Sequence, residues 1–182
     1  MPRLHLVRHG AAAAGYSEDP DPGLDDMGRV QAVQVAAALA TKGPLPILVS
    51  PLRRCRETAA PLEALWGATA TVEAGVAEVA APTDDLAERG AWLRRAMAGT
   101  WDELEDAPRA WRTRLLDTLA AVGTDTVVVT HFIAINAVLG AASADDRVLV
   151  ARLDNGSITT VDAGPDGFEV VSAGPIADTE VL

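Results

Sequence analysis

The sequence is poor in several residue types, and each shortage argues against a class of protein. Cys55 is the only cysteine among 182 residues, so no intramolecular disulfide can form, and we expect a reducing, cytoplasmic environment. Lys42 is the only lysine, and 15 basic residues stand against 26 acidic ones, which gives a net charge of −11. This shortage of positive charge argues against nucleic acid or an anionic membrane surface as a partner.

Long apolar runs are also missing. No run approaches the ~20 residues that span a bilayer, so we expect no transmembrane helix. His5 and Arg8 stand where a secretory signal would have its apolar segment. Because 49% of the residues are apolar and no linker or repeat interrupts them, we expect a single domain over residues 1–182.

The hydrophobic pattern alternates between strands and helices. It predicts strands at 4–7, 46–49, 69–74 and 126–130, and helices at about 25–41, 51–66, 108–122 and 132–140. Ser50 and Pro51 are expected to open the second of these helices as N-cap and first helical residue. Residues 148–153 and 158–161 flank an Asn-Gly pair and predict a hairpin. This order is typical of an α/β fold with a mostly parallel central sheet between two layers of helices.

Candidate functional side chains follow the predicted strands. His9 and His131 each come after an apolar strand, and the arginines within 53–56 come after another. Because ligands gather at the carboxyl ends of parallel strands, we expect these groups and Arg8 to form a cationic pocket there. Such a pocket suits a phosphoryl group, and a neutral imidazole inside it can attack phosphorus. His5 alternates within the first strand, and we expect it to be structural.

Four sequence blocks resemble one known family. They are Leu-Val-Arg-His-Gly at 6–10, Leu-Asp-Asp-Met-Gly-Arg-Val-Gln-Ala at 24–32, Ser-Pro-Leu-Arg-Arg-Cys-Arg-Glu-Thr-Ala at 50–59, and Val-Val-Thr-His at 128–131. In this order and spacing they resemble the histidine phosphatase superfamily, also called phosphoglycerate mutase-like. The resemblance implies that family's three-layer α/β/α sandwich.

The resemblance also implies roles for individual residues. His9 matches the nucleophile that accepts the phosphoryl group, and Arg8 and Arg54 match the arginines that hold phosphate oxygens. His131 matches the second histidine, which hydrogen-bonds the phosphoryl group and stabilises its transition state. Phe132 stands where glycine is common and leaves a backbone N–H for phosphate. With only three histidines and one cysteine, the sequence shows no metal-ligand motif, so we expect no metal site, and we expect no cofactor.

The proton donor is less closely defined by the sequence. The family has a carboxylate about one strand and a loop after the Ser-Pro block, and Glu78 is our choice for it. Burial in a pocket would raise the proton affinity of such a carboxyl group, as an acid catalyst requires. Glu73, earlier on the predicted strand, is the alternative, and the ordinary interpretation of Glu78 is a solvated loop acid.

Several positions depart from the family pattern and concern substrate choice. Ala11–Ala14 follow the Arg-His-Gly block where many members have polar residues that contact substrate. Asn136 stands where arginine is frequent, and Glu57 stands where glutamine is usual. These departures leave the phosphate pocket intact, but they leave the substrate undefined.

The sequence therefore predicts a metal-independent phosphatase acting on a small phosphomonoester or phosphohistidine through a phosphohistidine at His9. One alternative is a phosphoglycerate mutase-type phosphoryl transferase; another is a non-catalytic module that binds a phosphorylated ligand. The carboxylates near the expected mouth, Glu18 and Asp19 among them, predict a preference for small monophosphates over polyanions. No pattern in the sequence indicates an oligomeric state.

Overall fold

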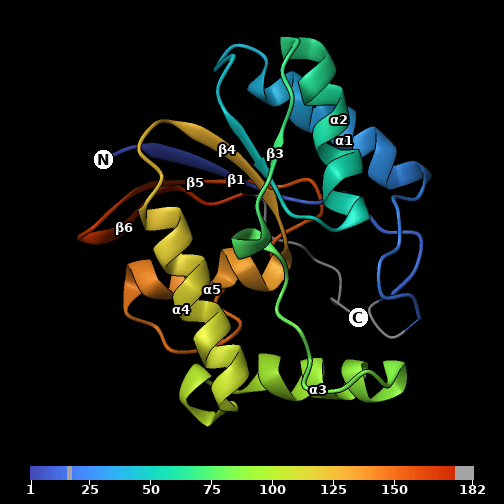
Figure 1. The fold of residues 1–182 in the computed structure, drawn as a ribbon, viewed down its shortest axis with the longest axis vertical. Helices are drawn as coiled ribbons and strands as arrows, with labels where there is room; N and C mark the ends of the chain where they lie inside the picture. The colour runs from blue at the N-terminus through green and yellow to red at the C-terminus, as the bar shows by residue number, and fades with distance from the viewer. Residues whose placement is uncertain (16–17, 175–182) are drawn as a thin grey trace.

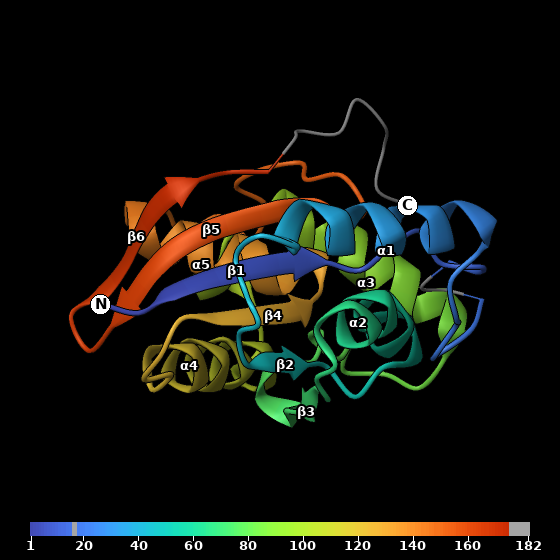
Figure 2. The same ribbon diagram turned by 90° about the horizontal axis from the view of Figure 1, so that it is seen from above.

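A six-stranded sheet forms the centre of the computed structural model, which describes residues 1–15 and 18–174. The strands are β1 (Arg3–Arg8), β2 (Ile47–Val49), β3 (Thr71–Val72), β4 (Thr126–Thr130), β5 (Ile158–Gly164) and β6 (Gly167–Ser172). Their order across the sheet is β3-β2-β4-β1-β5-β6, as Figure 2 shows from above. The first four of these strands pair in parallel, and β5 pairs antiparallel with both β1 and β6. The predicted mostly parallel sheet is confirmed.

Helices cover both faces of this sheet. They are α1 (Asp26–Leu39), α2 (Arg53–Trp66), α3 (Leu86–Ala98), α4 (Asp106–Ala120) and α5 (Phe132–Ser143), with short 3-10 turns at Ala74–Val76 and Trp101–Glu103. Figure 1 shows α1 and α2 together on one side of the strands, with α4 and α5 together on the other. The expected α/β fold with three layers is therefore observed. None of the described helices is long and apolar enough to cross a membrane.

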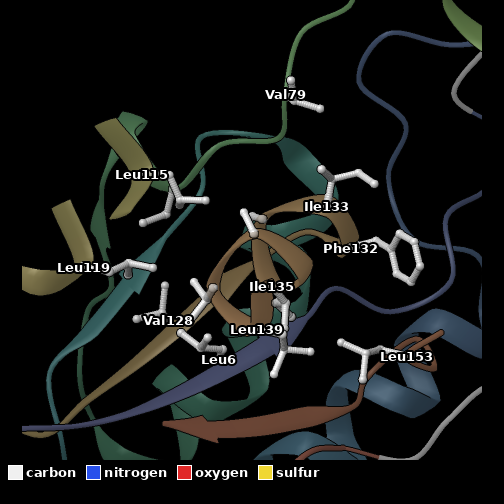
Figure 3. Packing of buried hydrophobic residues seen from close by; sticks show 14 of the residues in the cluster. Leu6, Val79, Leu115, Leu119, Val128, Phe132, Ile133, Ile135, Leu139 and Leu153 are labelled. Carbon is white, nitrogen blue, oxygen red and sulfur yellow. The ribbon is translucent and has the colours of Figure 1, made fainter. Parts of the chain in front are cut away.

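The two faces of the sheet follow from alternation along the strands. Leu6 of β1 and Val128 of β4 belong to the core that packs under α4 and α5. The next residues, Val7 and Val129, belong to the core under α1 and α2. Figure 3 shows Leu6 and Val128 beside Ile135 of α5 in the first of these cores. Because successive side chains of a strand point to opposite faces, a strand covered by helices on both faces needs consecutive apolar residues, as in Leu6-Val7 of β1 and Val127–Val129 of β4.

One segment beyond β4 differs from its prediction, whereas the helix and the strand predicted around it are present as α5 and β5. Residues 148–153 form no extended strand, so the predicted hairpin across the Asn-Gly pair is wrong. The hairpin that does form joins β5 to β6. Residues 148–153 instead pack beneath α5, where Val148 and Leu153 are buried and the Asn136 amide oxygen accepts hydrogen bonds from two backbone N–H groups. A side chain thus satisfies backbone groups that a partner strand would otherwise bond.

The predicted helix start at Ser50 and Pro51 is also wrong. Helix α2 begins at Arg53, and its N-cap residue Leu52 provides no side-chain hydrogen bond. The Ser50 hydroxyl lies 2.7 Å from the His131 ring, and this contact directs it away from a helix cap. The serine therefore belongs to the neighbourhood of the candidate site.

Candidate active site

The two histidines predicted to meet do lie side by side. Strands β1 and β4 pair with Arg8 opposite Thr130, so His9 and His131 follow equivalent strand ends. Their ring centroids are 5.2 Å apart. Arg54 of α2 lies between them, with Nε 3.1 Å from His9 Nε2 and a terminal nitrogen 3.2 Å from His131 Nδ1.

The hydrogen bonds of His9 define which of its nitrogens carries the proton. Nδ1 lies 2.8 Å from the carbonyl oxygen of Gly10, which only accepts, so Nδ1 must donate. Nε2 then has the lone pair, to which the Arg54 guanidinium donates. Burial and the nearby Arg54 charge lower the pKa of His9 to about 3, so its ring is neutral around pH 7. A neutral imidazole with its Nε2 lone pair available is the form that attacks phosphorus.

His131 is fully buried and is held from both sides. A guanidinium has no acceptor, so Nδ1 accepts from Arg54 and Nε2 donates to the Ser50 hydroxyl at 2.7 Å. Burial, then the neighbouring His9 and Arg54, lower the pKa of His131 well below its ordinary value. Cys55 lies against the same ring, with its sulfur 3.3 Å from Nε2. Burial raises the pKa of the Cys55 thiol, which agrees with its interpretation as a core cysteine.

Arg8 has an incomplete set of partners. Its side chain donates to the Leu153 carbonyl, and its guanidinium lies over the Phe132 ring at 4.7 Å from the centroid. Its Nε is buried, and the structure gives it no partner among the described residues. Chiefly because of burial, the pKa of Arg8 falls to about 10, so the side chain is still cationic at pH 7. An unpartnered buried donor of a cation is suited to an anion.

The structure separates the two candidate proton donors. Glu78 faces the cavity, and its two oxygens accept from the backbone N–H groups of Val79 and Ile133 at 3.0 and 3.2 Å. Burial raises the pKa of Glu78, although these bonds and the Arg54 charge oppose the shift. Glu73 instead accepts from the Gly75 N–H at 2.7 Å and does not line the cavity. The geometry therefore favours Glu78.

These groups lie at a cavity of about 430 Å³. Its lining consists of Arg8, His9, Ala11–Ala14, Gly15, Glu18, Asp19, Pro20, Pro22, Arg54, Glu78, Leu93, Phe132, Ile133 and Asn155. His131 lies behind this lining and reaches it through Arg54. Helix α5 begins at Phe132, so the first N–H groups of a helix are close to the cavity and favour an anion there.

Asn155 and Ser50 belong to this site, although the sequence does not predict it. Asn155 lines the cavity, and its side-chain amide donates to the His9 carbonyl at 3.1 Å. Its neighbour Gly156 donates to the Arg8 carbonyl at 3.0 Å. The Asn-Gly pair at 155–156 indicates a hairpin turn in the sequence, and only the tertiary structure brings this pair next to the end of β1. Ser50 was likewise interpreted as a helix cap.

Other predicted positions have different surroundings. Asn136 is fully buried, lies outside the cavity lining and binds backbone groups. Ala11–Ala14 line the cavity, as the sequence suggested for substrate contact. His5 is buried in the sheet, with Nδ1 3.1 Å from the Thr160 hydroxyl. Within residues 1–15 and 18–174, no group of three or more His, Cys, Asp or Glu side chains is arranged to hold a metal ion.

Comparison with known proteins places this geometry in a family. The chain is 32% identical to the uncharacterised Mycobacterium tuberculosis protein Rv0525 over 114 residues. This match covers 60% of this chain and 51% of that protein. The chain thus spans about half the length of the curated relatives it matches. The solved structure of mycobacterial hydrolase 1 is similar with a TM-score of 0.72 at 22% identity, over 97% of this chain and 100% of that one.

A second solved structure, the mycobacterial glucosyl-3-phosphoglycerate phosphatase Rv2419c in complex with VO3, has a TM-score of 0.68 at 23% identity, over 94% of this chain and 98% of that one. At these identities the two structures show a shared fold. The histidine phosphatase superfamily (branch 1) matches residues 4–174. The chain belongs to this superfamily, and its membership supports a phosphoryl-transfer function.

Proposed function

We propose that the chain is a metal-independent phosphatase that hydrolyses a small phosphomonoester through a phosphohistidine on His9. One observation carries the proposal: the neutral His9 ring has its unprotonated Nε2 beside Arg54, in a cavity that the buried Arg8 also lines. Arg8 and Arg54 supply fixed positive donors, and a transferring phosphoryl group needs such donors around its oxygens.

The first half-reaction forms a nitrogen–phosphorus bond and breaks a phosphorus–oxygen bond. His9 Nε2 attacks phosphorus, and the electron pair of the broken bond goes to the leaving oxygen. Arg54 donates to His9 Nε2, so this donor must turn to a phosphoryl oxygen before Nε2 can attack. Protonated Glu78 gives its proton to the leaving oxygen, which departs as an alcohol. The raised pKa of Glu78 suits it to hold that proton.

The second half-reaction returns the protein to its starting state. Glu78, now a carboxylate, takes a proton from a water molecule that attacks phosphorus. The nitrogen–phosphorus bond breaks, its electron pair returns to His9, and inorganic phosphate leaves. His131 supports this step by holding Arg54 through Nδ1, and the backbone N–H of Phe132, at the start of α5, offers a further donor to the phosphate.

The lining of the cavity favours transfer to water over a mutase reaction. A mutase must also hold the carboxylate of a sugar acid, for which a further cation is the usual partner. Among the described lining residues, Arg8 and Arg54 are the only cations, and both lie beside His9. A module that only binds a phosphorylated ligand would not need a carboxyl group of raised pKa facing the cavity, as Glu78 does.

Trapping the intermediate tests the proposal. The protein is treated with a chelator, mixed with p-nitrophenyl phosphate and quenched in alkali or acid during turnover. We expect hydrolysis without metal and a phosphoenzyme that survives alkali but not acid, as a phosphoramidate should. His9→Ala should lose both, whereas the control His5→Gln, changed at a buried histidine outside the site, should retain both. Activity restored only by added metal, or an acid-stable adduct, would refute the mechanism.

A further inference from the structure

The cavity has opposite charges at its two ends. Arg8 and Arg54 line the cavity together with His9, and the two residues are 8% and 7% exposed. Glu18 and Asp19 line the same cavity from the loop before α1, and both are exposed to solvent. A ligand that fills the cavity therefore meets buried cations at one end and exposed carboxylates at the other.

The buried end is built to receive an anion. Arg8 is more than nine-tenths buried and lines the cavity, and its Nε has no hydrogen-bond partner among the described residues. A phosphate dianion at this end would offset the charges of Arg8 and Arg54. Once it is bound, no positive charge of the described lining is left for a second anionic group.

The exposed end carries two carboxylates held on the loop backbone. Glu18 Oε2 accepts from the Gly15 N–H at 2.8 Å, and Asp19 Oδ1 accepts from the Asp21 N–H at 2.9 Å. The nearby Arg53 does not line the cavity, and its Nε bonds to the Glu57 carboxylate at 2.7 Å. This end therefore attracts a cation and repels an anion.

The adjoining surface does not change this balance. The hollow beyond Pro20 carries one acidic and one basic residue, Asp84 and Arg89, whose charges offset each other. Apart from the charged groups at its two ends, His9, Glu78 and Asn155, the wall of the cavity is apolar. Its apolar side chains include Ala11–Ala14, Leu93, Phe132 and Ile133. Such a wall suits methylene groups and offers few hydrogen bonds to a polyhydroxylated sugar.

We propose that the cavity selects a phosphomonoester whose leaving group is a short aliphatic alcohol carrying an ammonium group, with Glu18 and Asp19 as the residues that receive the ammonium. This inference rests on the proposed phosphatase function and adds the class of substrate to it. Leaving groups that bear a carboxylate or a second phosphate are disfavoured. The ester is cleaved between phosphorus and the alcohol oxygen as described above, and the ammonium takes no part in bond making.

Two esters of nearly equal size test the proposal, because they differ only in the charged group at the end. O-phosphoethanolamine ends in an ammonium and 2-phosphoglycolate in a carboxylate. For the wild-type protein we expect kcat/KM for the first to exceed that for the second by about tenfold or more at low salt. The ratio should fall as ionic strength rises, since the Debye length shrinks from about 30 Å at 0.01 M to about 10 Å at 0.1 M.

Matched variants distinguish the effect of the Glu18 and Asp19 charges on the kcat/KM ratio from a difference in intrinsic reactivity between the two esters. In Glu18→Gln/Asp19→Asn the ratio should fall about tenfold relative to the wild-type protein. The control Asp166→Asn/Glu169→Gln removes the same charge from the exposed β5–β6 hairpin, outside the cavity, and should keep the wild-type ratio. Intrinsic reactivity of the esters cancels in this comparison, because every protein is given the same pair.

The outcomes distinguish a failure of this substrate inference from a failure of the proposed phosphatase function. If p-nitrophenyl phosphate is hydrolysed but 2-phosphoglycolate is preferred or equal, the substrate inference is overturned and the phosphatase proposal stands. If no ester is hydrolysed, the phosphatase proposal itself fails. Should the double variant lose all activity, the salt dependence of the wild-type ratio decides, and a ratio that does not change with salt overturns the inference.

Discussion

Asn136 links the core to the site, and its replacement by alanine gives a prediction with a calculable magnitude. The amide oxygen of Asn136 accepts from the N–H groups of Val150 and Ala151 at 2.8 and 2.7 Å. Its nitrogen donates to the carbonyl oxygen of Phe132 at 3.0 Å. Asn136→Ala removes all three bonds, and the two N–H groups are left without their acceptor.

The magnitude follows from those two N–H groups. A buried donor that loses its acceptor costs about 1–3 kcal/mol, and the partial exposure of Val150 and Ala151 places each near the lower half of that range. The expected loss in the free energy of unfolding is therefore about 2–4 kcal/mol. For a chain of this length, that loss lowers the melting temperature by about 5–15 °C.

Urea unfolding followed by circular dichroism measures this loss. The control is Ser143→Ala, which removes a hydroxyl bond to the Leu139 carbonyl at the exposed end of the same helix and should cost less than about 0.5 kcal/mol. Because Leu153 follows the pinned segment and its carbonyl accepts from Arg8, kcat/KM of Asn136→Ala should also fall. A loss of stability equal to that of Ser143→Ala would refute the reasoning.

Two further predictions concern titratable groups. Glu78→Gln should lower kcat/KM about 10²–10⁴-fold for an alkyl phosphate. For p-nitrophenyl phosphate, whose leaving group needs no proton, the loss should be less than about tenfold. The control is Glu73→Gln, which changes the carboxylate that does not line the cavity. Because the pKa of Glu78 is raised, wild-type activity on the alkyl ester should fall as pH rises through that pKa; equal losses on both esters would reassign the acid. His5, His9 and His131 all have lowered pKa values, so the unfolded chain binds more protons than the folded one below pH ~6.5. The contribution of the three histidines to the free energy of unfolding, measured in urea, should therefore be complete above that pH. It should fall towards pH 5 by up to about 1.4 kcal/mol per pH unit for each histidine, and the proton that Glu78 gains on folding opposes this slope by the equivalent of one histidine. A flat profile would contradict this, and His9→Asn should make the profile shallower.

The parts of the fold that could be predicted are those that local pattern determines. Strand β4 has the bounds predicted for it, because a short run of β-branched residues between two helical patterns is typical of a buried parallel strand. The meeting of His9 and His131 follows from the same reasoning, since each follows a strand end and the two strands are neighbours. Residues 148–153 were mispredicted because their apolar residues are buried by α5, and local pattern cannot distinguish that burial from a strand.

The parts of the site that could not be predicted depend on contacts between distant segments. Ser50 has the sequence context of a helix cap, yet it bonds to His131, which lies 81 residues later. Asn155 reads as a turn residue, yet it holds the His9 carbonyl from 146 residues away. The choice between Glu73 and Glu78 needed the cavity as well, because both carboxylates lie on the same short connection.

The sequence block at 24–32 contains no catalytic candidate, but its packing against residues 10–11 explains why its glycine and glutamine are needed. A Cβ on Gly10 would lie 2.5 Å from the Gly28 carbonyl oxygen, and a Cβ on Gly28 would lie 2.1 Å from the Ala11 carbonyl oxygen. Neither approach is possible for any other residue without moving backbone. Gln31 completes the contact, since its amide oxygen accepts from the Ala11 N–H at 2.7 Å. The start of α1 thus packs directly on the backbone that follows His9, and the Gly10 carbonyl fixed there holds the His9 ring in the form with an unprotonated Nε2.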